Sequence, residues 1–107
     1  MKVYIAGKIT GNDNYRAEFS EASEKIRGCG DIPLNPAILP EGMECADYMR
    51  ICLAMLDSAD AIALLPSWAH SKGACIEMAL AEYTHKRKIY TWRIPTMKEC
   101  EKDGGTE

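Results

Sequence analysis

Short runs of apolar residues alternate along this chain with longer segments in which apolar side chains recur every three or four positions. The short runs predict buried strands near residues 2–6, 31–35, 59–65 and 89–92. The longer segments predict amphipathic helices over residues 14–27, 44–58 and 74–83. The second helix is expected to bury Tyr48, Ile51, Cys52, Met55 and Leu56. Strands that alternate with helices predict a parallel sheet with helices on both faces.

This order of elements predicts a small doubly wound α/β domain of the flavodoxin-like or Rossmann-like type. We expect three α/β/α layers and a mostly parallel sheet of four to five strands over residues 1–95, with residues 96–107 as a C-terminal helix or tail of the same domain. In such sheets a ligand binds beyond the C-terminal ends of the strands, where the strand order reverses. The loops at residues 7–13 and 66–73 are therefore expected to meet at the binding site.

Composition and charge narrow the classes of function. The net charge of −3 argues against a protein that binds the nucleic-acid backbone, which normally presents a basic face. No apolar run approaches the roughly 20 residues that span a bilayer, so no membrane contact is expected. The first seven residues are too short and too strand-like for a secretory signal, which favours a cytoplasmic protein.

The cysteines are odd in number and scattered, without C-x-x-C spacing, which fits a reducing compartment. They are Cys29, Cys45, Cys52, Cys75 and Cys100. Their spacing does not favour a zinc site with His70 or His85. We therefore expect neither a metal nor an organic cofactor.

The stretch from residue 66 to residue 77 combines a polar loop, a helix start and a glutamate. Ser71 is a favourable N-cap residue, and Gly73 permits another group to approach the backbone. The unpaired N–H groups and partial positive charge of a helix N-terminus suit an anion. Glu77 would lie one to two turns into the helix, with its side chain leaning back toward the same opening.

Three segments carry a resemblance to a known family. They are residues 3–7 with the Gly11 loop, residues 59–62, and residues 71–77. The last of these segments matches the pattern Ser/Asp-x-Gly-x-x-x-Glu. In these segments the chain resembles the nucleoside 2-deoxyribosyltransferase-like family. That family includes deoxynucleoside 5′-monophosphate N-glycosidases and uncharacterised phage and bacterial members. The similarity covers about residues 1–92, and the third segment is its most specific part.

The resemblance implies cleavage of the N-glycosidic bond between a base and a ribose or deoxyribose. The glutamate of the family, here Glu77, attacks the anomeric carbon, and water or a second base resolves the glycosyl-enzyme intermediate. The tyrosine of the first strand, here Tyr4, positions that glutamate by a hydrogen bond. In the members that cleave monophosphates, the Gly7 loop and the helix start at Ser71 and Gly73 bind the 5′-phosphate. Lys8 and Thr10 would add a cation and a hydroxyl to that site.

The predicted substrate-binding residues are Gly7, Lys8, Thr10, Asp60, Trp68, Ser71, Gly73 and Ala74. Two of them have a second explanation that the sequence leaves open. Trp68 either stacks on the base or acts as a lid or subunit contact. Asp60 either contacts the substrate or orders backbone at the start of its strand.

The chain departs from the family at two positions. Family members usually carry an aspartate on the helix before the third strand, and residues 49–53 contain no carboxylate. Transferases also borrow an asparagine from the C-terminal segment of a neighbouring subunit, and residues 96–107 contain none. These departures favour hydrolysis over transfer. The missing helix carboxylate also favours a rival hypothesis, a non-catalytic nucleotide-binding module that lost the acid, whereas the retained Tyr4 and Glu77 favour the enzyme.

A third hypothesis is a structural or phage-associated oligomeric protein. An open pocket with Glu77 beside Tyr4 would argue against it, whereas a Glu77 packed away from any cleft would argue against the enzyme. Small doubly wound domains commonly bury helix faces against one another, so we expect a homodimer or a larger homo-oligomer. The expected small-molecule partner is a nucleoside or nucleotide.

Overall fold

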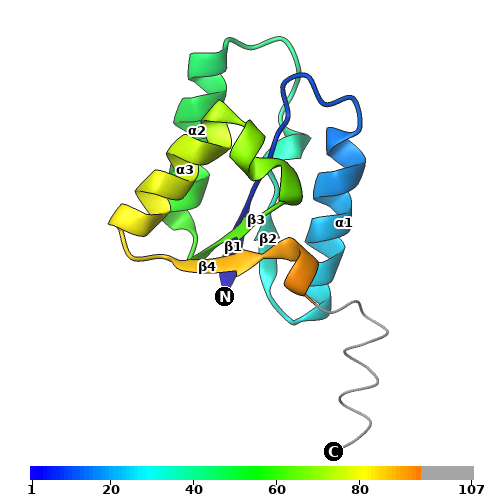
Figure 1. Cartoon of the computed structure of the whole chain (residues 1–107), viewed down its shortest axis with the longest axis vertical. Helices are drawn as coiled ribbons and strands as arrows, with labels where there is room; N and C mark the ends of the chain where they lie inside the picture. Colours follow the sequence, from blue (N-terminus) through cyan, green and yellow to red (C-terminus); the bar gives the residue numbers. More distant parts are fainter. Residues whose placement is uncertain (95–107) are drawn as a thin grey trace, which may run out of the picture.

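The structure is a computed structural model that describes residues 1–94 (Figure 1). The described part contains four strands and three α-helices in alternation. In chain order they are β1 (Lys2–Ala6), α1 (Tyr15–Gly28), β2 (Ile32–Leu34), α2 (Cys45–Ser58), β3 (Ala61–Leu64), α3 (Lys72–Tyr83) and β4 (Arg87–Tyr90). Short 3-10 turns are η1 (Pro36–Ile38), η2 (Pro66–His70) and η3 (Thr91–Arg93). The expected C-terminal helix or tail at 96–107 lies outside the described residues.

The strands form one parallel sheet in the order β2-β1-β3-β4. From β1 the chain crosses over to β2 on one side, and β3 then lies on the other side of β1. The strand order therefore reverses between β1 and β3, as the sequence predicted. This arrangement confirms the doubly wound α/β class.

The helices cover both faces of the sheet, with α1 on one side and α2 and α3 on the other (Figure 1). Successive side chains of β1 alternate between the faces because a strand has a period of two. Val3 and Ile5 pack in the apolar cluster with α1, whereas Tyr4 and Ala6 pack in the cluster with α2 and α3. Tyr4 thus points toward the helix that carries Glu77.

Some boundaries and one buried face differ from the predictions. Helix α3 begins at Lys72 directly after its N-cap Ser71, and β4 begins at Arg87 because its backbone pairs with Ala61 of β3. In α2 the buried side chains are Cys52 and Leu56. Ile51, which was expected in the buried stripe, is exposed. The described helices include none with the length and apolarity needed to cross a membrane.

Candidate functional site

A cavity of about 890 Å³ lies at the C-terminal edge of the sheet, at the point where the strand order reverses. Four parts of the chain line it: β1 with the loop that follows, the first turns of α1, residues 36–49 with the adjoining turns of α2, and the start of α3. Its volume falls in the range of small-molecule sites, which is roughly 300–1,000 Å³. The two loops predicted to meet at this edge both contribute, since Gly7 and Ser71 line the cavity.

Tyr4 and Glu77 form a buried pair in the lining of this cavity. The Tyr4 hydroxyl donates a hydrogen bond of 2.6 Å to Oε2 of Glu77, although 73 positions separate the two residues in the chain. Tyr4 is 1% exposed and Glu77 is 6% exposed. The topology explains the contact, because a side chain in the middle of β1 faces the second turn of α3.

Burial governs the ionisation of this pair. It raises the pKa of Glu77 to about 7, and the hydrogen bond from Tyr4 partly opposes that rise. Burial also raises the pKa of Tyr4, and the negative charge of Glu77 raises it further. The phenol therefore remains a donor at any physiological pH, while the carboxyl group changes charge near neutrality.

Helix α2 places a thiol beside this pair. Cys52 lines the cavity, is almost fully buried and packs in the same apolar cluster as Tyr4. Burial raises the pKa of the Cys52 thiol, so the thiol is neutral at pH 7. The α2 residues that line the cavity are Cys45, Ala46, Tyr48, Met49 and Cys52. The face that α2 turns to the cavity therefore carries no carboxylate among the described residues.

The start of α3 has the geometry of an anion site. The Ser71 hydroxyl accepts a hydrogen bond of 3.1 Å from the Ala74 N–H, so Ser71 is the N-cap that the sequence predicted. A side-chain carbon added at Gly73 would meet no atom closer than 3.6 Å, which leaves this backbone open to a ligand. Lys8 and Thr10 also line the cavity. Five of the predicted binding residues therefore line one cavity: Lys8, Thr10, Ser71, Gly73 and Ala74.

Gly7 lines the same cavity, and the packing around it explains why this position has no side chain. A Cβ atom at Gly7 would lie 2.6 Å from Cδ1 and 2.9 Å from Cβ of Leu65. Real Cβ atoms do not approach others so closely, so the packing of Leu65 alone demands a glycine there. Next to it, the Lys8 N–H donates to the Ser67 hydroxyl at 3.0 Å and ties this loop to η2.

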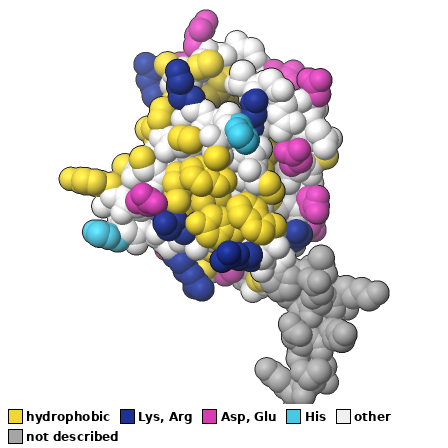
Figure 2. All heavy atoms as spheres, in the orientation of Figure 1, with side chains coloured by type: hydrophobic (Ala, Val, Ile, Leu, Met, Phe, Trp, Pro, Cys, Tyr) yellow, Lys and Arg dark blue, Asp and Glu magenta, His cyan; other side chains and the backbone are white. Residues whose placement is uncertain are grey.

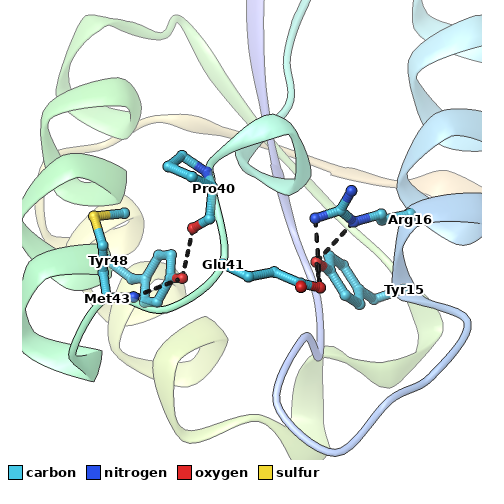
Figure 3. Close-up of polar contacts among 6 residues, drawn as sticks. All are labelled: Tyr15, Arg16, Pro40, Glu41, Met43 and Tyr48. Atoms are coloured by element: carbon cyan, nitrogen blue, oxygen red, sulfur yellow. Dashed lines mark hydrogen bonds and ion pairs between the residues drawn. The ribbon is translucent and has the colours of Figure 1, made fainter.

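The loop at residues 39–44, after β2 and η1, crosses from the α1 side of the cavity to the α2 side, and Figure 3 shows its contacts. On the α2 side, the Tyr48 hydroxyl donates to the Pro40 carbonyl at 2.6 Å. The same hydroxyl accepts a hydrogen bond of 3.3 Å from the Met43 N–H. These two contacts fix the loop to the first turns of α2.

On the α1 side, a single carboxylate makes the contacts of this loop (Figure 3). Glu41 lies 3.5 Å from the Arg16 guanidinium and 3.5 Å from the Tyr15 hydroxyl. Nε of Arg16 donates to the Tyr15 hydroxyl at 2.9 Å. Glu41 and Tyr15 line the cavity, and the sequence analysis assigned a function to neither. The available signal was their position in the chain, since Glu41 lies in the segment after β2 and Tyr15 begins the helix after β1, at the edge of the sheet where ligands bind.

A family described as a domain of unknown function, DUF4406, matches residues 1–90. The chain belongs to this DUF4406 family. No curated protein matches this chain. Among solved structures, it is similar to a 2-desoxiribosyltransferase from Leishmania mexicana, with a TM-score of 0.66 and 21% sequence identity. The match covers 83% of this chain and 62% of that one. At this identity the likeness shows the fold, a deoxyribosyltransferase-like α/β domain.

Two predicted substrate contacts of this DUF4406 chain lie outside the cavity. Asp60 precedes β3 at the opposite edge of the sheet, where its Oδ2 accepts a hydrogen bond of 2.8 Å from the Lys2 N–H. That backbone hydrogen bond lowers the pKa of Asp60. Trp68 lies in η2 and packs against the apolar cluster of α2 and α3 without lining the cavity. Asp60 therefore orders backbone, and the stacking role predicted for Trp68 has no support in this geometry.

Proposed function

We propose that this protein is an N-glycosidase that cleaves the bond between the base and the sugar of a (deoxy)nucleoside or its 5′-monophosphate. The observation that carries the proposal is the buried Tyr4–Glu77 hydrogen bond inside a cavity of about 890 Å³. A carboxylate in an apolar cavity with a perturbed pKa is a recurrent feature of catalytic sites. The deoxyribosyltransferase-like fold supports a nucleoside as the substrate.

In the proposed reaction, a Glu77 carboxylate oxygen attacks C1′ of the sugar as the bond from C1′ to the base nitrogen breaks. The base departs with that electron pair and takes up a proton, and the sugar remains attached to Glu77 as an ester. Water then attacks C1′, gives up a proton, and releases the free sugar and the carboxylate. The transition states resemble an oxocarbenium ion, which a nearby carboxylate stabilises.

Tyr4 positions the nucleophile in this scheme. Its hydroxyl donates to Oε2 of Glu77. One carboxylate oxygen is thereby fixed, and rotation of the carboxyl group is restricted. Because the hydrogen bond favours the charged form, it also increases the fraction of Glu77 that is ionised at neutral pH.

The α3 N-terminus and the loop after β1 form the proposed phosphate site. The Ser71 cap leaves the other backbone N–H groups of the first turn available, and the helix dipole favours a negative charge there. Lys8 supplies a positive charge from the opposite loop. A 5′-phosphate held in this place would fix the sugar relative to Glu77, which is a main source of rate enhancement in positioned reactions.

Chromatography of the free base released from a panel of ribo- and deoxyribonucleosides and their 5′-monophosphates tests the proposal. The wild-type protein should release base, whereas Glu77→Gln should release none and Tyr4→Phe should be slower by about ten- to a hundredfold. Glu82→Gln, which removes an exposed carboxylate of α3 paired with Lys88, is the matched control and should retain full activity. The wild-type rate should rise with pH through about 7, because Glu77 must be ionised to attack.

A specific result would favour a non-catalytic nucleotide-binding module instead. The cavity-lining face of α2 carries Cys52 and no carboxylate, so the structure supplies no acid there to protonate the departing base. Failure to release base from every substrate, together with measurable nucleotide binding by calorimetry, would identify the protein as such a module.

We also propose that the protein forms a homodimer or a larger homo-oligomer. Several large apolar side chains are exposed, among them Ile76 and Trp92. Figure 2 shows hydrophobic side chains gathered over η2 and β4, on the edge of the sheet. There the rings of Tyr90 and Trp92 lie 5.0 Å apart. Light scattering coupled to size-exclusion chromatography would give the mass in solution, and a monomer at all concentrations would contradict the proposal.

A further inference from the structure

We infer that Glu41 reads the base, and that the site selects a base with two adjacent N–H donors on its edge, as guanine has. This inference rests on the proposed function, because it names the substrate class of the same cavity. It concerns the end of the cavity formed by the loop at residues 39–44 and the tyrosines of α1 and α2, which we call the strap end.

The charges along the cavity place the base at the strap end. Among the described residues that line the cavity, the lysines are Lys8, on the loop after β1, and Lys72, at the start of α3. Among the described lining residues, the carboxylates are Glu77 and Glu41. Glu77 accepts a hydrogen bond from Tyr4, and in the proposed reaction it attacks the sugar carbon. Glu41 is therefore the carboxylate available to the remaining part of a nucleotide, which is the base.

The strap end also has side chains of the kinds that commonly hold a flat heterocycle. Met43 and Met49 supply thioether side chains, and Tyr15 and Tyr48 supply rings from opposite helices. Proteins that bind a free base commonly hold its faces between aromatic or apolar side chains and read its edge with hydrogen bonds. Among the described side chains at the strap end, Glu41 supplies the carboxylate that can pair with the edge of a base.

A carboxylate accepts hydrogen bonds at both oxygens and donates none. Guanine presents its N1–H and its 2-amino group side by side, so both carboxylate oxygens find a donor. Adenine, cytosine and uracil each present an acceptor beside a single donor, and that acceptor would face a carboxylate oxygen. Hypoxanthine keeps the N1–H but has a C–H in place of the 2-amino group, so one carboxylate oxygen would be left without a donor. A site built to pair with a substrate N–H discriminates strongly against an analogue that lacks it, because its own polar group is left unpaired.

The present contacts of Glu41 leave it free to make this interaction. Its side chain is 78% exposed, and its two neighbours, the Arg16 guanidinium and the Tyr15 hydroxyl, are each 3.5 Å away. Exposed pairs at such distances contribute little to stability. A base that excludes water from the strap end therefore competes with weak contacts only.

The test compares guanine and hypoxanthine 5′-deoxynucleotides, which differ only in the 2-amino group. The wild-type protein should cleave the guanine nucleotide with a kcat/KM about ten- to a hundredfold higher, the range expected for a bidentate contact. Glu41→Gln keeps the size of the side chain but replaces one acceptor with a donor. It should remove most of that preference by lowering kcat/KM for guanine while leaving hypoxanthine nearly unchanged. Glu24→Gln, at an exposed ion pair of α1, is the matched control and should keep the preference.

Three outcomes would overturn the inference while leaving the proposed function intact. They are equal rates for the two nucleotides, a preference for an adenine or pyrimidine nucleotide, and a Glu41→Gln variant that slows both nucleotides equally. The last would show that Glu41 acts by anchoring the loop to α1. If the wild-type protein releases no base at all, calorimetric Kd values for the same two nucleotides decide the question separately. Tighter binding of guanine that Glu41→Gln abolishes would support the inference even though the proposed function had failed, and equal Kd values would overturn it.

Discussion

Neutralising Glu77 should make the protein more stable at alkaline pH, although it should abolish catalysis. In Glu77→Gln, the amide oxygen can still accept the hydrogen bond from Tyr4 and the volume is unchanged. The substitution removes the ability to carry a negative charge and replaces one carboxylate oxygen with an amide N–H donor. The wild-type carboxyl group is 6% exposed, and burial raises its pKa to about 7 from a usual value of 4.5. Ionisation of Glu77 in the folded state therefore lowers the free energy of unfolding.

The size of that cost follows from the two pKa values. A group with a higher pKa in the folded state binds more protons there than in the unfolded state, so stability falls as pH rises between the two values. The interval from 4.5 to about 7 corresponds to about 3 kcal/mol at roughly 1.4 kcal/mol for each pH unit. The loss of stability caused by ionised Glu77 is absent below pH 4 and reaches its full size above pH 8. The free energy of unfolding of Glu77→Gln, relative to the wild type, should thus increase by about 3 kcal/mol across this range.

Urea denaturation of both proteins at several pH values between 4 and 8 measures this difference, because comparing the two proteins cancels all other titrating groups. Glu82→Gln provides the control for removal of an exposed carboxylate, and its difference from the wild type should stay within about 0.5 kcal/mol throughout. A difference between Glu77→Gln and the wild type that does not change with pH would refute the reasoning. It would mean that water reaches the carboxylate and that its pKa is close to the usual value.

Two further predictions concern the backbone. Gly7→Ala should destabilise the fold by about 2 kcal/mol, because the new Cβ would lie 2.6 Å from the Leu65 side chain. Gly73→Ala, where the nearest atom is 3.6 Å away, is the control, and thermal denaturation that finds equal losses would contradict this account. His85 adopts a φ of 60° after α3, a region that costs residues with side chains about 1 kcal/mol. His85→Gly should raise the melting temperature by a few degrees, and a lower value would show that the His85 side chain makes a compensating contact.

The fold was predictable because the hydrophobic pattern and the topology agree. β1 and β3 are runs of buried residues, and their length and composition distinguish them from the helices that follow. The start of β4 was harder to place, since Arg87 and Lys88 are exposed and resemble the end of a helix. Their backbone pairs with β3, and a ladder of backbone hydrogen bonds leaves no trace in side-chain polarity. Ile51 is exposed because α2 buries a narrower face than its apolar pattern suggests. The width of that face depends on the packing against the sheet and not on the sequence of α2 alone.

The site residues that lie close together in the sequence were predictable from a local pattern. Ser71, Gly73 and Glu77 belong to one helix start, and the resemblance paired Glu77 with Tyr4. The sequence left both a substrate role and a backbone role open for Asp60. It stands at the start of its strand, and a side chain there lies far from the cavity at the opposite edge of the sheet. Glu41 was missed because its loop has no periodicity. Its position depends on contacts of the loop with Tyr48 and Arg16, which only the folded chain brings together.

The cost of burying Glu77 separates a catalytic role from a structural one. A buried carboxylate that serves the fold is stabilised by its partners, so its pKa is lowered and its removal weakens the protein. Among residues 1–94, Tyr4 is the hydrogen-bonding partner of Glu77, and burial outweighs that hydrogen bond in setting the pKa of Glu77. In the proposed reaction, the same poor solvation that destabilises the charged form would make the carboxylate more reactive toward the sugar carbon. A Glu77→Gln variant that is more stable at pH 8 and inactive would therefore show that the fold tolerates this glutamate for its chemistry.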